Sequence, residues 1–196
     1  MTASLTVLFV CHANLCRSPM AEHLFRRAVD ARLDDGAGAV EVQSAGTDAW
    51  ADQPMHPFAI GILRERGADV SDFRTRRLNP AAVTRADVVL TAAREQRAAA
   101  VLMQPAAVKR TFTLPQFARL AGQVVAVGPL AATDPAGRLR ELVERIPMMR
   151  GQLPAPPAGQ DEIADPVRQP IEGFRRCGTE IDRLVTDLAA IIVPRR

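Results

Sequence analysis

The stretch VLFVCHANLCRSPMAEHLF, residues 7–25, changes character in its middle. Its apolar beginning belongs to a continuous run over residues 5–10, which is typical of a strand buried on both faces of a parallel sheet. Pro19 stands just inside the next element, where a missing backbone N–H costs a helix nothing. The stretch therefore predicts a strand that ends at Cys11, a tight loop, and a helix with Arg17 at its mouth.

Strand and helix patterns alternate along the rest of the chain. Further strands are expected at 38–46, 86–92 and 108–114, with the last at an edge of the sheet. Helices are expected at 56–70, 94–103, 115–122 and 167–193. Such alternation is typical of β-α-β units and predicts an α/β fold with a parallel sheet covered on both faces. Ligands of these folds bind beyond the carboxyl ends of the strands, where the loop after Cys11 lies.

Composition indicates an ordinary globular protein that handles neither nucleic acid nor membrane. The apolar fraction is 47% and the charged fraction 24%, and the net charge is +3. We expect one domain, residues 1–196, with a Pro- and Gly-rich surface insertion at about 128–164 that contains one helical patch. The arginines are scattered with few aromatics between them, and no apolar run approaches the roughly 18 residues of a membrane span. Without a secretion signal, a cytoplasmic location is expected.

The loop of residues 12–17 joins a thiol to a guanidinium. Backbone N–H groups of such a loop, together with a helix N-terminus, form a nest for a tetrahedral anion such as phosphate. The fork of Arg17 can hold two oxygens of that anion, with Cys11 beneath the phosphorus. The same dipoles favour the thiolate form of Cys11, and Ser18 can donate a hydrogen bond to its sulfur. The pattern predicts a nucleophile aimed at a phosphate ester.

Several segments resemble the low-molecular-weight protein tyrosine phosphatases, in particular bacterial members of the actinobacterial type. They are VLFVCHANLCRSPMAE, SAGTDAW, ADVVLTAAREQR, VKRTFTLPQFARL and DPVRQPIEGF, and together they span most of the chain apart from 128–164. The resemblance implies a three-layer α/β/α sandwich with a four-stranded parallel sheet, the phosphotyrosine phosphatase I-like fold. It also implies hydrolysis of phosphotyrosine in protein substrates, or of other aryl phosphate monoesters, without a metal or cofactor.

Carried onto this chain, the family's mechanism begins with attack of Cys11 on phosphorus to give phosphocysteine, while Arg17 and the loop amides hold the oxygens. An Asp protonates the leaving phenol and then deprotonates the hydrolytic water. Two Asp-Pro pairs compete for this role, at Asp134 and Asp165, and either Asp could instead cap a helix. The family places an aromatic nine residues after its Asp, which Phe174 satisfies for Asp165. We therefore predict that Asp165 is the general acid and base.

The resemblance also suggests a phosphate- and substrate-binding set. Its members are His12, Ala13, Asn14, Leu15, Cys16, Trp50 and Val167. Asn14 is expected to brace the loop in a left-handed conformation, Ser44 to support it from a buried position, and Trp50 to form a wall of the pocket. Cys16 is either a packing residue or the partner of oxidised Cys11 in a protective disulfide.

Three residues depart from the family's pattern. Ala13 occupies a site that is often Gly and would be strained there if the site requires positive φ. Phe73 stands where many members carry a His that orients the loop Asn. Val167 stands where an aromatic usually forms the second wall of the substrate slot. These changes leave Cys11, Arg17 and the acid in place but bear on substrate preference and rate.

Three other functions use the same residues. A thiol-dependent arsenate reductase coupled to a small thiol would also use Cys11 as nucleophile, but it has no need of an Asp-Pro loop. A metal site built from Cys11, His12, Cys16 and His23 has loose spacing, and Arg17 would repel the cation. A non-catalytic phosphate binder needs neither a thiol nor an acid.

Overall fold

The computed structural model describes residues 5–33, 40–150, 157 and 159–194. The strands are β1 (Leu5–Cys11), β2 (Val40–Gly46), β3 (Val88–Thr91) and β4 (Thr111–Thr113). They form a parallel sheet in the order β2-β1-β3-β4, which confirms the predicted four parallel strands and the edge position of the last one. The first two residues of the strand predicted at 38–46 lie outside the described part of the chain.

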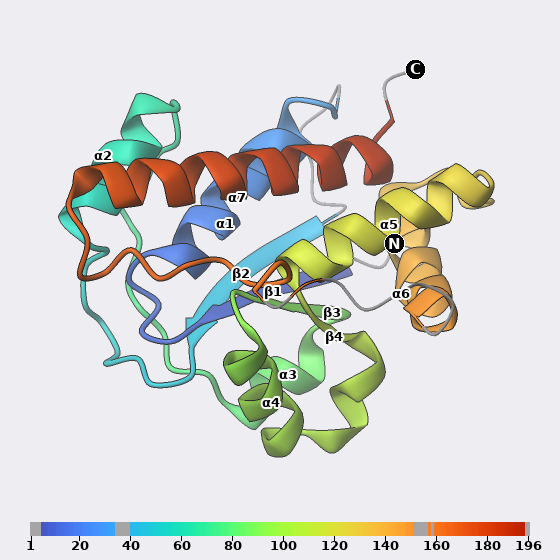
Figure 1. The fold of residues 1–196 in the computed structure, drawn as a ribbon, viewed down its shortest axis with the longest axis horizontal. Coiled ribbons are helices and arrows are strands. Elements are labelled where there is room, and N and C mark those ends of the chain that lie inside the picture. Colours follow the sequence, from blue (N-terminus) through green and yellow to red (C-terminus); the bar gives the residue numbers. More distant parts are fainter. Residues whose placement is uncertain (1–4, 34–39, 151–156, 158, 195–196) are drawn as a thin grey trace.

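Helices cover both faces of this sheet (Figure 1). They are α1 (Arg17–Asp30), α2 (Pro57–Glu65), α3 (Pro80–Arg85), α4 (Arg94–Met103), α5 (Leu114–Val127), α6 (Pro135–Arg150) and α7 (Ile171–Ile192), with a 3-10 helix at Pro105–Arg110. Figure 1 shows α1, α2 and α7 on one side of the sheet and α3 and α4 on the other. The three layers that the family resemblance implies are therefore present. The short helix α3 was not predicted; the Asn79 side chain caps it by accepting from the Ala82 N–H.

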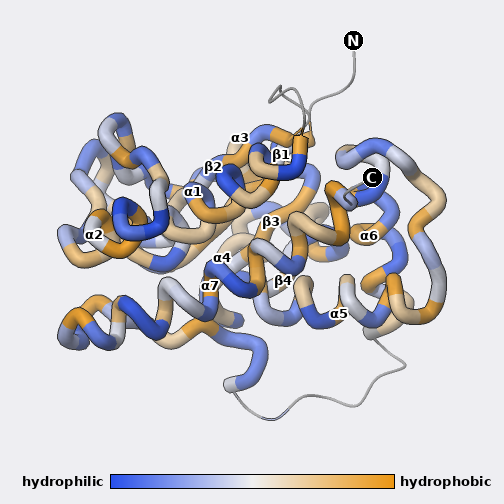
Figure 2. Tube along the Cα trace, turned by 90° about the horizontal axis from the view of Figure 1, so that it is seen from above, coloured by the Kyte–Doolittle hydropathy of each residue, from blue (hydrophilic) through white to orange (hydrophobic). Residues whose placement is uncertain are grey.

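The sheet separates two hydrophobic cores. Successive side chains of β1 point to opposite faces, so Val7 and Phe9 join the larger core with α1, α5 and α7. Leu8 and Val10 join the smaller core on the side of α3 and α4. In Figure 2 the long helix α7 alternates between hydrophobic and hydrophilic residues, as expected of a helix with one buried face. Burial on both faces explains the unbroken apolar run that opens the chain.

Helix α6 corrects the expectation of a surface insertion over 128–164. Leu139, Leu142 and Ile146 are fully buried and belong to the larger core, and α6 packs against α5 and α7. The spacing of these three apolar residues predicts a helix, but the Pro and Gly residues on either side hid how long that helix is. Residues 151–156 and 158 of the predicted insertion lie outside the described part of the chain.

The strand order reverses next to β1, and the loop that follows β1 lies at this reversal. The connection from β1 leads to β2 on one side, and β3 lies on the other side of β1. Loops at the carboxyl end of a parallel sheet, where the strand order reverses, leave a crevice between them. The segment that begins at Cys11 opens into this crevice.

Candidate active site

Cys11 ends the inner strand and is only 3% exposed. Its Sγ lies 3.0 Å from the hydroxyl oxygen of Ser18, in the first turn of α1. The same hydroxyl is 3.2 Å from the Ala45 carbonyl oxygen. Because a hydroxyl carries one proton, Ser18 can donate to the sulfur or to the carbonyl, but not to both at once.

Asn14 adopts the left-handed conformation that the sequence predicted, with φ of 55°. Its Nδ2 donates to the hydroxyls of Ser18 and Ser44, both at 2.9 Å. Its Oδ1 accepts from the backbone N–H of Arg76 at 2.8 Å. Both N–H donors and one lone pair of the oxygen of this buried amide thus hold the loop in one shape.

A buried carboxylate continues this support behind Ser44. The Ser44 hydroxyl donates to Glu22 at 2.6 Å, as expected of a buried polar support. Arg26 at 2.8 Å and Arg76 at 3.2 Å balance the charge of Glu22, which is required of a carboxylate so deeply buried. Sequence reasoning missed Glu22 and Arg76. The only signal was an acidic residue on the buried face of the predicted helix.

Gly46, at the end of β2, allows the loop to lie directly against the sheet. A Cβ there would come within 2.5 Å of the His12 carbonyl oxygen and 2.7 Å of the Asn14 nitrogen. Among described non-glycine residues, positive φ occurs only at Asn14 and Asp52, so Ala13 carries no such strain. Within the described chain, the backbone N–H groups of residues 12–16 donate to no protein acceptor. They are therefore available to an oxyanion.

Arg17 is buried and connects the loop to the segment that carries Asp165. One terminal nitrogen donates to the Ile163 carbonyl at 3.2 Å, and the other forms an ion pair with the Asp165 carboxylate. The Asp165 side chain is 41% exposed, and its Oδ1 also accepts from the Val167 N–H at 3.1 Å. The structure thus brings Arg17 and Asp165 together at the end of the loop that begins at Cys11.

The competing Asp134 lies elsewhere. Its Oδ1 accepts from the Gly137 N–H at 2.8 Å at the start of α6. This is the helix-capping role that the sequence left open for both aspartates.

Trp50 is 83% exposed and lines a cavity of about 210 Å³ with Ala13, Leu15 and Gln53. Trp50 therefore lies beside the loop with an exposed side chain, and its role as a pocket wall stays a prediction. Val167 is also exposed. His12 lies at the rim, with Nε2 4.0 Å from the Asp48 carboxylate.

Phe73 is buried and meets His23 edge-on, with ring centroids 5.8 Å apart. It makes no hydrogen bond to the loop, because a phenyl ring has no polar atom. The backbone of Arg76 supplies the donor to Asn14 instead.

The other two cysteines are buried thiols. Burial, reinforced by the neighbouring Cys11, raises the pKa of Cys16 far above its usual range. Burial raises the pKa of Cys177 to about 12, although the charge of Arg17 opposes this. Both remain protonated at neutral pH, so neither competes with Cys11 as a thiolate nucleophile. All three cysteines are free, and the protective disulfide between Cys11 and Cys16 stays a prediction.

The described residues contain no group of three or more His, Cys, Asp or Glu that could hold a metal ion. They also contain no helix with the length and apolar character needed to cross a membrane.

The fold and site define a class of α/β proteins in which a buried cysteine lies beneath a loop shaped for an oxyanion. A family model described as low molecular weight phosphotyrosine protein phosphatase matches residues 6–130, more than half of the chain. The chain belongs to this family, as the resemblance of its segments predicted.

Named relatives support this membership at two levels of coverage. A probable low molecular weight protein-tyrosine-phosphatase EpsP of Ralstonia solanacearum is 39% identical over 43% of this chain, a match that spans about half (53%) of that relative. A low molecular weight protein-tyrosine-phosphatase of Streptomyces coelicolor is 29% identical over 95% of this chain and 92% of its own length.

Among solved structures, the YwlE arginine phosphatase from Geobacillus stearothermophilus superposes with a TM-score of 0.65. It is 29% identical and covers 94% of this chain and 90% of its own. Relatives named for two different phosphorylated residues therefore share this fold.

Proposed function

We propose that this protein is a protein tyrosine phosphatase that hydrolyses phosphotyrosine and other aryl phosphate monoesters through a phosphocysteine on Cys11. The observation that carries the proposal is the Arg17–Asp165 ion pair, because it joins an oxyanion-binding guanidinium to a carboxylate beside a buried thiol. Residues 1–196 are proposed to form one phosphatase domain. Cys11 must stay reduced to act, which fits a cytoplasmic location.

Phosphate would be bound by N–H groups that make no hydrogen bond within the described chain. The guanidinium of Arg17 has five N–H donors, of which the contacts to Ile163 and Asp165 use two. The remaining donors and the amides of residues 12–16 can surround three oxygens of a phosphate monoester. Because the loop is already fixed by Asn14, little reorganisation accompanies binding.

In the first chemical step the Cys11 thiolate attacks phosphorus. The S–P bond forms as the bond from phosphorus to the phenolic oxygen breaks. Asp165 gives a proton to that oxygen, which requires that it leave its ion pair with Arg17 and take up a proton from solvent when the phosphate occupies Arg17. In the second step Asp165 takes a proton from water, whose oxygen attacks phosphorus. The S–P bond breaks, phosphate leaves, and a hydrogen bond from Ser18 stabilises the thiolate that is regenerated.

The substrate class follows from the walls of the pocket. Leu15 and the exposed ring of Trp50 present apolar surface next to the loop, which suits a phenyl ring. On the opposite side the family's usual aromatic is replaced by Val167, so a bound ring would be held from one side. We expect phosphotyrosine-containing proteins as partners and weaker binding of small phenyl phosphates.

Phosphoarginine is the second candidate substrate, because an arginine phosphatase covers nearly the whole chain in the structural comparison. The same nucleophile and acid would cleave a P–N bond in place of a P–O bond. The wall at Trp50 and Leu15 suits a phenyl ring, and the face of a Trp ring also attracts a guanidinium, so the wall alone does not separate the two substrates.

The direct test compares wild type and Cys11→Ser on phosphotyrosine peptide, phosphoarginine peptide, and arsenate with a small thiol. The proposal predicts hydrolysis of phosphotyrosine by wild type only. Faster turnover of phosphoarginine would transfer the assignment to that substrate. Reduction of arsenate without hydrolysis of any phosphorylated peptide would favour the reductase, and binding without turnover would favour a phosphate-binding protein.

A further inference from the structure

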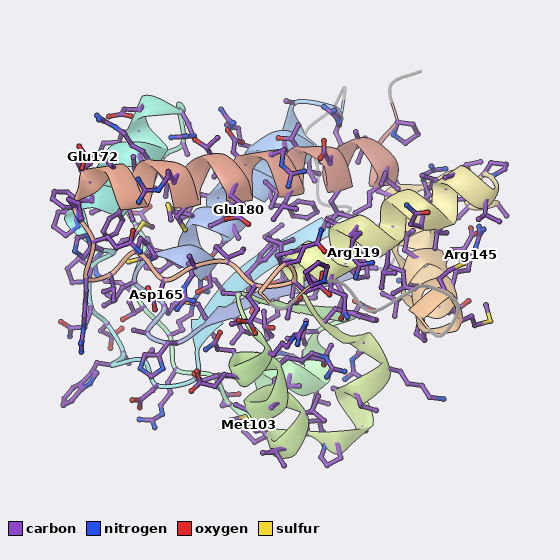
Figure 3. All side chains as sticks on the ribbon, viewed as in Figure 1. Met103, Arg119, Arg145, Asp165, Glu172 and Glu180 are labelled. Atoms are coloured by element: carbon purple, nitrogen blue, oxygen red, sulfur yellow. The ribbon has the colours of Figure 1, made fainter. Side chains whose placement is uncertain are left out.

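The segment that carries Asp165 is held at its beginning by an ion pair with a buried carboxylate, and the mechanism above does not use this pair. Arg119, on α5, donates through Nε to Asp161 Oδ1 at 3.3 Å and through one terminal nitrogen to Oδ2 at 3.1 Å. Asp161 is 2% exposed. Figure 3 shows Arg119 on α5 and Asp165 on the segment that passes α5 and runs towards the start of α7.

Only three residues separate Asp161 from the acid, and they have little freedom. The Ile163 N–H donates to the Ala92 carbonyl at 2.8 Å, beyond the end of β3. The Ile163 carbonyl accepts from Arg17, and its side chain is buried. A shift at Asp161 is therefore transmitted along a short, anchored piece of backbone to the carboxylate of Asp165.

If the pair only filled the space between α5 and the Asp165 segment, two apolar residues could do so at a lower cost in free energy. Replacing a buried ion pair by well-packed apolar residues is often neutral or stabilising, so its charge contributes little to net stability. A bidentate guanidinium–carboxylate contact does fix distance and orientation. A general acid needs such accuracy, because a misplacement of about 1 Å can cost a factor of about 100 in rate.

We propose that Arg119 and Asp161 are positioning residues that place the Asp165 carboxylate against the leaving-group oxygen. The inference rests on the proposed function. It gives a role in proton transfer to a residue of α5, a helix far in sequence from the phosphate loop (residues 12–17). The Arg119–Asp161 contact involves neither Arg17 nor the loop of residues 12–17, so its loss is expected to affect Asp165 more than phosphate binding.

The test uses two aryl phosphates that differ in their need for an acid. Phenyl phosphate has a poor leaving group and depends on protonation, whereas para-nitrophenyl phosphate has a good one and depends on it little. In Arg119→Gln and Asp161→Asn, kcat/KM is expected to fall about 10-fold on phenyl phosphate and at most about twofold on para-nitrophenyl phosphate. Inhibition by inorganic phosphate is expected to stay within about twofold of wild type.

Arg145→Gln is the matched control. Arg145 is as exposed as Arg119 (27% against 29%) and also pairs with a carboxylate, Glu141, but it lies on α6. Its removal is expected to leave the ratio of the two kcat/KM values unchanged. Asp165→Asn is the positive reference, because it removes the acid itself and should change that ratio most.

The outcomes separate the inference from the proposed function. A changed ratio in Arg119→Gln and Asp161→Asn, in the direction of Asp165→Asn, supports the positioning role. Equal losses on both substrates, or an unchanged ratio while Asp165→Asn changes it, overturn the positioning role and leave the phosphatase standing. If wild type hydrolyses neither substrate, the proposed function fails and the inference fails with it.

Discussion

The phosphate loop and the segment that carries Asp165 are built in opposite ways. Asn14 and Ser44 are buried, and the loop's amide, hydroxyl and carboxylate supports are bonded to one another. Asp165 is 41% exposed and is attached to the rest of the molecule through backbone contacts and ion pairs. The part that grips a tetrahedral anion is fixed before substrate arrives, whereas the part that moves protons is presented at the surface.

This difference matches the two tasks. Stabilising charge in a transition state requires donors that do not reorganise, which explains a fully bonded loop. A proton donor must meet leaving groups of different shapes and later meet water, which requires access to solvent. Substitutions in the loop should therefore weaken phosphate binding, whereas substitutions in the Asp165 segment should slow proton transfer.

The largest effect is expected from Asp165→Asn. The amide keeps the size of the side chain but cannot give or take a proton, so kcat on phenyl phosphate should fall by about 100- to 10,000-fold. The matched substitution Asp134→Asn should leave kcat unchanged, because Asp134 caps α6. Steady-state kinetics of both variants decides the assignment, and near-normal turnover by Asp165→Asn would refute it.

A smaller loss is expected from Asn14→Ala. It removes three hydrogen bonds and leaves the Arg76 N–H without its acceptor, with a cost of about 1–3 kcal/mol in unfolding free energy. Inhibition by inorganic phosphate should weaken as the loop loses its shape. Denaturant titration and phosphate inhibition measure the two effects. Unchanged phosphate inhibition would show that the loop does not need its brace.

A change confined to substrate binding is expected from Trp50→Ala. The exposed ring makes no contact with phosphate, so KM for a phosphotyrosine peptide should rise about threefold to tenfold while inorganic phosphate inhibits as before. Phe58→Ala, at a partly exposed aromatic on α2, is the control. A fall in kcat without a change in KM would contradict the role of a pocket wall.

The smallest effect concerns pH. Burial lowers the pKa of His23, which packs against Phe73, and of His56, whose backbone N–H donates to the Leu15 carbonyl. The unfolded chain then binds more protons than the folded one, so stability is present above the unfolded pKa of about 6.5 and is lost as pH falls below it. Thermal unfolding followed from pH 7.5 to about pH 5 should show a falling Tm. His23→Gln should reduce the slope, and an unchanged slope would assign the loss to other groups.

The sequence predicted the strand, loop and helix around Cys11 because their signals are local: an apolar run, a helix-opening proline and an arginine at fixed spacing. The partners of Asn14 were only partly predictable. Ser44 belongs to a recognisable segment, but Arg76 meets Asn14 across 62 positions and Arg119 meets Asp161 across 42. Such pairs depend on tertiary packing, which no spacing along the chain encodes. For the same reason the sequence did not show that α6 packs its apolar face against α5.

The central claim is that the phosphoryl group passes through the sulfur of Cys11. Rapid acid quenching of wild type during turnover of para-nitrophenyl phosphate, followed by mass spectrometry of its peptides, tests this directly. We predict one phosphoryl group on the peptide that contains Cys11, bound to sulfur, and none in Cys11→Ser treated in the same way. Turnover at full rate with phosphate on another residue, or with no phosphorylated peptide at any quench time, would contradict the account.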